Sequence, residues 1–203
     1  MIQTNIKLED LKDYYCFGVA GNFANHLGEA GEADEFAVIA TQEKDAPKGL
    51  FPFYIPSHES FLGEFPICHD KINHNNMDQL QVEAEVGLIC DFEYDNGKLH
   101  DIKPRYFTAF NDCSNRIQDG NKLSTKKNWG KSSKGISSDF IEVDNFDESG
   151  VLNKFHIASF VRRDGILKDY GTVSAVNSYS YFFEQLKTWM IEKFNSQEDC
   201  GPL

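Results

Sequence analysis

The chain has 203 residues, of which 40% are hydrophobic and 13% aromatic, and this is enough apolar material for the core of one domain. Its 32 acidic and 20 basic residues give a net charge of −12, so we expect no nucleic-acid partner, because phosphate backbones are bound by lysine and arginine. No apolar run approaches the roughly 20 residues of a membrane-spanning helix, and residues 1–13 lack the apolar centre of a signal peptide. The sequence therefore predicts a soluble cytoplasmic protein with no membrane partner.

Short apolar segments punctuated by glycine and proline predict an α+β domain that is mostly β. The predicted strands are, in chain order, Tyr15–Val19, Phe36–Ala40, Val82–Cys90, Tyr106–Asn111, Phe140–Val143 and Phe155–Phe160. One helix is predicted at Tyr179–Asn195, where large apolar residues recur at helical spacing, and we expect it to pack on the core. Residues 43–56 contain no motif, and we expect them to form a loop beside a pocket.

A histidine and a glutamate follow the first predicted strand, in the segment from Gly21 to Glu32. Their spacing of three residues places His26 and Glu29 on one side of a helical turn. A carboxylate that accepts a hydrogen bond from one imidazole nitrogen raises the basicity of the other nitrogen, which can then take a proton from water. The same pattern is also typical of an ordinary surface pair, and the spacing by itself leaves both interpretations open.

Three carboxylates lie at or beside two of the predicted strands. Alternation in residues 81–90 places Glu83 and Glu85 on one strand face, roughly 7 Å apart, where their charges repel. Asp112 follows the strand Tyr106–Asn111, and strand ends often present functional side chains. With no His/Cys cluster nearby, such a set favours Mg²⁺, Mn²⁺ or Ca²⁺ over Zn²⁺. A metal site is therefore one interpretation, and a solvated strand face is the other.

A cluster of lysines follows in an otherwise acidic chain. Its members lie within thirteen residues: Lys122, Lys126, Lys127, Lys131 and Lys134. A lysine from this segment could meet a substrate carboxylate, or the negative charge that develops on a carbonyl oxygen beside the metal. An exposed, purely solvated loop explains the same cluster equally well.

Taken together, these segments resemble the fumarylacetoacetate hydrolase family in order and spacing, from about residue 16 to residue 190. The matching motifs are GxNYxxHxxE with Gly21-Asn22-Phe23, His26 and Glu29, ExE with Glu83-Ala84-Glu85, NDxSxR with Asn111, Asp112, Ser114 and Arg116, GKS with Gly130-Lys131-Ser132, and a Gly-x-Thr type of turn with Gly171-Thr172. Two positions depart from the family pattern. Phe23 stands where the family has tyrosine, and Gln118 is displaced from the usual glutamine position.

The resemblance implies one domain over residues 1–203, a mixed β-sandwich roll like the C-terminal domain of that family, and a homodimer. It also implies that Mg²⁺, or Mn²⁺ or Ca²⁺ in its place, is held by Glu83, Glu85 and Asp112. The other roles that it implies are those of His26 as the base, Glu29 as the group that orients it, Lys131 as a catalytic and substrate-binding residue, and Arg116, Gly171 and Thr172 as further substrate contacts.

The function that the resemblance implies is metal-dependent hydrolysis of a small diketo or acylpyruvate-like acid. A carbon–carbon bond is cleaved, and the metal stabilises the enolate-like leaving group. The alternatives are decarboxylation or keto–enol isomerisation of a small dicarboxylate, which depends less on His26, and a degenerate protein without catalytic activity. The family's PGDVIxTGTPxGxG segment and the strands after it have no counterpart before Leu203. We therefore expect a shortened or interrupted member, or one whose sheet is closed by another element or subunit.

Overall fold

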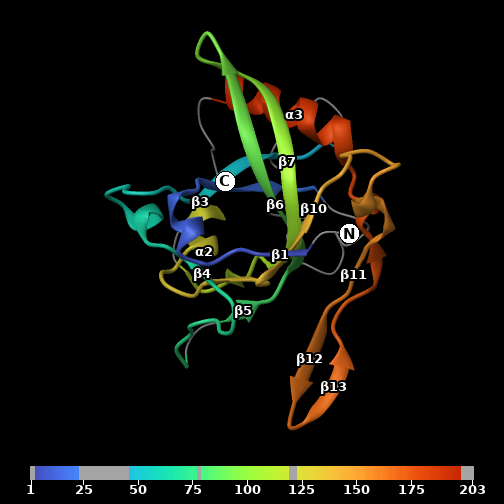
Figure 1. Ribbon diagram of the computed structural model, residues 1–203. Coiled ribbons are helices and arrows are strands. Elements are labelled where there is room, and N and C mark those ends of the chain that lie inside the picture. The colour runs from blue at the N-terminus through green and yellow to red at the C-terminus, as the bar shows by residue number, and fades with distance from the viewer. Residues whose placement is uncertain (1–2, 23–45, 77–78, 119–122, 198–203) are drawn as a thin grey trace.

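The computed structural model describes residues 3–22, 46–76, 79–118 and 123–197, and within them strands far outnumber helices (Figure 1). This confirms the predicted class, α+β and mostly β. The helices are α2 (Leu123–Lys127), α3 (Phe183–Ser196) and the 3-10 turns η1 (Asp10–Asp13), η2 (Phe61–Gly63), η3 (Val151–Lys154) and η4 (Val176–Ser178). The strands are β1 (Gln3–Asn5), β2 (Cys16–Ala20), β3 (Gly49–Tyr54), β4 (Ile67–Cys68), β5 (Leu80–Gln81), β6 (Ala84–Asp95), β7 (Lys98–Asn111), β8 (Ser114–Asn115), β9 (Lys134–Ile136), β10 (Asp139–Glu142), β11 (His156–Ile157), β12 (Phe160–Arg163), β13 (Ile166–Asp169) and β14 (Ser174–Ala175).

The two longest strands, β6 and β7, form an antiparallel hairpin that extends toward α3 (Figure 1). Its turn consists of Asn96 and Gly97, which have φ values of 48° and 79°, and these two residue types adopt that left-handed region at the least cost. At the other end of the hairpin the ladder continues past the strands, since the Asp112 amide donates to the Glu83 carbonyl at 2.9 Å. The hairpin confirms two predicted strands and holds two of the predicted carboxylates side by side.

The main sheet is built on this hairpin, in the order β1-β10-β7-β9-β4, with β6 on the other edge of β7. The short strands β10 and β9 share one edge of β7, where Phe107 pairs with Ile141 and Phe110 pairs with Ile136. Strand β9 also pairs in parallel with β4. Because β9 begins at Lys134, this residue enters the sheet next to the last residues of β7.

Helix α3 confirms the predicted C-terminal helix, shifted by a few residues. It buries Leu186 and Trp189 in a cluster with Leu50 of β3, and it contacts β3 and β7. The Asn195 side chain completes the packing, because its amide group both accepts from the Leu99 amide at 2.9 Å and donates to the Leu99 carbonyl at 2.8 Å. No helix within the described residues has the length and apolar character needed to cross a bilayer.

Two sequence predictions are wrong, and one lies outside the described residues. Residues 43–56 were expected to form a loop, but Gly49–Tyr54 form strand β3, whose apolar side chains are buried against β2. Phe155–Phe160 was expected to be one strand, but it divides between β11, which pairs with β14, and β12, which pairs with β13 in a separate projecting hairpin (Figure 1). The alternation of apolar residues could not reveal this change of partner. The predicted strand Phe36–Ala40 lies outside the described residues.

Candidate functional site

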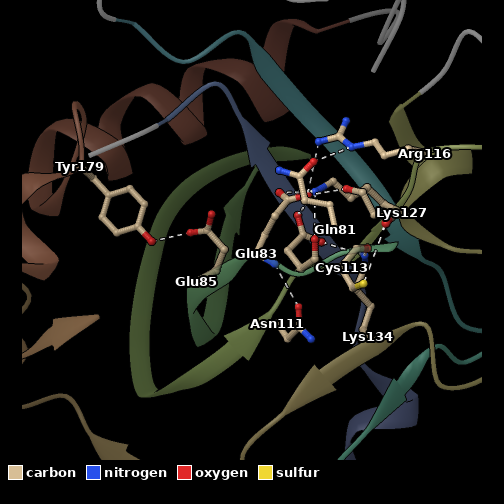
Figure 2. Close-up of polar contacts among 11 residues, drawn as sticks. Gln81, Glu83, Glu85, Asn111, Cys113, Arg116, Lys127, Lys134 and Tyr179 are labelled. Atoms are coloured by element: carbon tan, nitrogen blue, oxygen red, sulfur yellow. Dashed lines mark hydrogen bonds and ion pairs between the residues drawn. The ribbon is translucent and has the colours of Figure 1, made fainter. Parts of the chain in front are cut away.

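Two carboxylates at the open end of the β6–β7 hairpin share one buried ammonium group. Lys127 Nζ lies 2.7 Å from Glu83 Oε2 and 2.9 Å from Asp112 Oδ2, and it also donates to the Asp112 carbonyl at 3.0 Å. A second lysine, Lys134, lies 3.0 Å from Asp112 Oδ1 and donates to the Cys113 carbonyl (Figure 2). The end of the hairpin is thus a compact charge network of two acids and two bases.

The two lysines reach this network from different elements. Lys127 is the last residue of α2, and Lys134 is the first residue of β9, where its amide donates to the Pro66 carbonyl at 3.0 Å. Their side chains are 3% and 0% exposed. Burial lowers the pKa of Lys134 to about 8, although Asp112 opposes this shift. Burial also raises the pKa of Asp112, but the two lysines more than offset this, so its pKa lies below the usual range and the pair is ionised at neutral pH.

Two polar groups complete the surroundings of Glu83. The Ser114 hydroxyl donates to Glu83 Oε1 at 2.5 Å, and Arg116 Nη2 lies 3.9 Å from the same oxygen. Arg116 is held in place by Gln81, whose side-chain oxygen accepts from Arg116 Nε at 2.8 Å (Figure 2). The pairing of β5 with β8 places Gln81 opposite Ser114 and so brings these groups together. Glu83 is therefore bound on both oxygens.

Glu85 has a different partner. The Tyr179 hydroxyl, from the segment between η4 and α3, donates to Glu85 Oε2 (Figure 2). Burial raises the pKa of Glu85 to about 7, and the hydrogen bond from Tyr179 opposes the rise. Burial, together with the charge of Glu85, also raises the pKa of Tyr179 well above its usual value. A carboxyl group that titrates near neutral pH is suited to accept or donate a proton.

Glu85, Asp112 and Tyr179 lie at the wall of a cavity of about 290 Å³. Most of the other lining residues are apolar and come from β2, β6, β7 and α3. Pockets of this kind, apolar with a few convergent polar groups, are the usual form of small-molecule sites. The charge network therefore borders a space that a small molecule could occupy.

The predicted metal ligands do not converge on one point. Lys127 separates Glu83 from Asp112, and Glu85 is bound to Tyr179. Accordingly, no group of three His, Cys, Asp or Glu side chains within the described ranges is arranged to hold a metal ion. The donor chemistry nevertheless fits a hard cation, since the oxygens of Glu83 and Asp112 already share one cation, the Lys127 ammonium.

The other predicted site residues lie in different places. Arg116 belongs to the network, whereas the Lys131 side chain is exposed and its backbone carbonyl accepts from Asn73 at 2.9 Å. Gly171 and Thr172 lie in the exposed segment between β13 and β14. His26 and Glu29 lie outside the described residues, so the geometry of that pair stays a prediction.

No motif in the sequence marks Lys127, Lys134 or Tyr179 as site residues. Lys127 and Lys134 were in the lysine cluster, but the GKS motif directed attention to Lys131. One signal for Lys127 was present, because it lies four residues after the buried Leu123 and so shares its helix face. Nothing in the local sequence marks Tyr179, whose partner is 94 residues away.

Comparison with known proteins finds a match to a family of unknown function. Residues 32–203 match a model described as "Family of unknown function (DUF5718)". No curated protein matches the chain, and no solved structure matches it. Function must therefore be inferred from the site itself.

Proposed function

Because the chain belongs to DUF5718, a family of unknown function, we propose its activity from the site: it is a divalent-metal-dependent enzyme that acts on a small anionic carbonyl compound. The leading reaction is hydrolytic cleavage of a carbon–carbon bond in a diketo or acylpyruvate-like acid. The finer assignment of the fold, to the roll of the fumarylacetoacetate hydrolases, and the homodimer belong to the same proposal.

The observation that carries the proposal is the charge network at the polar end of the apolar cavity. Its two acids, Glu83 and Asp112, are paired with the bases Lys127 and Lys134, and Arg116 lies 3.9 Å from Glu83. A bound divalent cation would leave an excess of positive charge, and an anionic substrate would neutralise it. Charged groups at the polar end of an otherwise apolar cavity are typical of small-molecule sites, and this favours a binding site over a purely structural network.

Glu83 and Asp112 are the residues that would hold Mg²⁺, and Glu85 would join them by giving up its hydrogen bond with Tyr179. When bound, Mg²⁺ would polarise the substrate carbonyl and offset the negative charge that develops as a carbon–carbon bond breaks. The buried lysines would place positive charge behind Asp112, where it attracts an anionic substrate, because water does not screen it. Proton removal from the attacking water is assigned, by resemblance, to His26 with Glu29.

Replacing Asp112 with asparagine tests the metal site. Asparagine keeps the shape of the side chain but removes the charge that the cation needs, so we expect Mn²⁺ affinity to fall by roughly 100-fold or more. The measurement is calorimetric titration of Mn²⁺, with circular dichroism to verify the fold. The matched control is Asp91→Asn, on the exposed part of β6, which should bind like the wild type. Equal affinity in the wild type and Asp112→Asn would exclude this site.

The substitution Lys127→Met is expected to change Mn²⁺ affinity in the opposite direction. The Lys127 ammonium competes for the oxygens of Glu83 and Asp112 at 2.7 and 2.9 Å, so its removal is expected to tighten Mn²⁺ binding by roughly tenfold or more. Lys103→Met, on the exposed part of β7, is the control. Unchanged or weaker binding by a folded Lys127→Met protein would show that the ion does not use these oxygens.

One observation favours keto–enol isomerisation as a second candidate. Glu85 and Tyr179 form a carboxyl–phenol pair at the cavity, and Glu85 has a pKa of about 7, which suits a base that moves a proton between carbon and oxygen. Isomerisation of a carbonyl acid should then be lost in Glu85→Gln and kept in His26→Ala. The hydrolytic reaction predicts that His26→Ala is inactive, so the two variants separate the candidates.

A further inference from the structure

The cavity extends from the charge network beneath helix α3. On the sheet side it is lined by β6 and β7, whose residues there include Glu85, Gly87 and Phe110. On the other sides it is lined by residues of β2 and α3, of which Phe17 and Met190 are examples. Polar and apolar parts of the lining are thus separated along β6.

The end of the cavity away from Glu85 is aromatic. Phe194 of α3 packs edge-on against Phe17 and against Phe92, with ring centroids 5.1 Å apart in both pairs. The one lysine among the described lining residues, Lys187, is already paired with Asp101 and Glu184 at 3.1 Å each. A second substrate carboxylate placed here would lose its hydration without gaining a cation, which is costly. This end therefore suits an uncharged, apolar group.

Gly87 leaves the middle of the cavity open. It stands in β6 two residues after Glu85, and a Cβ atom at this position would lie 3.3 Å from both Phe110 Cβ and Thr108 Cγ2. Both neighbours also line the cavity. Any larger side chain at position 87 would therefore project into the passage between the polar and aromatic ends.

We propose that the substrate is a carbonyl monoacid with an extended apolar tail, and that the tail occupies this cavity while the acid group lies at its polar end, beside the divalent cation that Glu83 and Asp112 would hold. The inference rests on the proposed function for its polar end, and it narrows the small anionic carbonyl compound to a monoacid with a longer apolar tail. A volume of about 290 Å³ accommodates a tail of up to about nine carbons, if each carbon group takes about the 30 Å³ of a water molecule. The large share of apolar lining supports the same chemistry.

The experiment measures the affinity of the full chain for straight-chain 2-oxo acids of increasing length, from 2-oxobutanoate to 2-oxodecanoate. Calorimetry is carried out with and without Mg²⁺. Each added CH₂ group is expected to lower Kd by about fourfold until the cavity is full, which corresponds to the usual transfer free energy of a buried methylene. A Kd that does not change with tail length would overturn the inference.

Gly87→Val assigns the effect to this cavity. The valine side chain is expected to remove the gain in affinity for the long acids and to leave the Kd for 2-oxobutanoate within about twofold of the wild-type value. Ala109→Val is the matched control, because Ala109 lies between Thr108 and Phe110 on β7 and so points to the opposite face of the sheet. If Gly87→Val lowers thermal stability, Met190→Trp repeats the test from the opposite wall. A length dependence that survives both substitutions would overturn the inference.

The same titrations keep the two proposals apart. A gain with tail length that Gly87→Val abolishes supports the inference whether or not Mg²⁺ contributes. Mg²⁺-dependent binding of 2-oxobutanoate, lost in Asp112→Asn but without any gain for longer acids, would overturn the inference and leave the proposed function standing. If Kd falls with tail length but Mg²⁺ has no effect on binding, the inference stands and the proposed function is overturned.

Discussion

Lys134→Met is expected to lower the free energy of unfolding by about 3 kcal/mol, because it removes a fully buried charge and leaves its partner Asp112 with one cation in place of two. Methionine fills nearly the same volume, so packing contributes little to the loss. The measurement is urea denaturation of the two proteins at neutral pH, followed by circular dichroism. The comparison of midpoints at equal slope gives the change in stability.

Lys131→Met is the matched control for this prediction. The two lysines are three residues apart, but the Lys131 side chain is exposed, and such surface changes usually stay within about 0.5 kcal/mol. In the double variant Lys134→Met with Asp112→Asn, part of the loss should be recovered, since the unpaired carboxylate is gone. Equal stabilities of Lys134→Met and Lys131→Met would show that the buried network does not stabilise the fold.

The stability of the metal-free protein is expected to fall as the pH rises from about 4.5 to about 7, and the cause is Glu85. Burial raises its pKa from 4.5 to about 7, so the folded state binds this proton more tightly than the unfolded chain does. The resulting stabilisation is fully present below the unfolded pKa and is lost as the pH rises through the folded pKa. Its size is at most about 3 kcal/mol, since one pKa unit corresponds to about 1.4 kcal/mol.

Glu85→Gln isolates this contribution, because glutamine stays neutral and can still accept the hydrogen bond from Tyr179. The free energies of unfolding of wild type and variant should diverge between about pH 5 and about pH 7, with the variant the more stable above about pH 7. Tyr179→Phe should extend the fall to higher pH, since the hydrogen bond from Tyr179 lowers the pKa of Glu85. Parallel pH profiles for wild type and Glu85→Gln would contradict the assignment.

The polar site has two parts with different roles. Glu83, Asp112 and the two lysines form a network of ion pairs, which suits it to hold a cation or an anion in place. Glu85 and Tyr179 instead form a pair that changes protonation near neutral pH. The cavity meets both parts, because Glu85 and Asp112 line it. A carbonyl acid bound there would face charge stabilisation on one side and proton transfer on the other.

The sequence by itself determined the mostly-β class, two of the long strands, the C-terminal helix, and the placement of Glu83 and Glu85 on one strand and of Asp112 at the end of another. These features follow from the spacing of apolar and polar residues over a few positions, which can be recognised in the sequence alone. The local pattern did not show that these two strands are neighbours, and it is the register of β6 and β7 that brings Glu83 and Asp112 together.

Only the tertiary structure decided which bases meet these acids. Lys127 and Lys134 reach Glu83 and Asp112 across 44 and 22 residues of sequence, and Tyr179 reaches Glu85 across 94, so no local pattern could select them over the exposed Lys131. Strand β3 was missed for a related reason. It forms by pairing with β2, and β2 lies in a different part of the chain. The burial that shifts the pKa values arises only once these distant segments have packed together, and the cavity also forms only then.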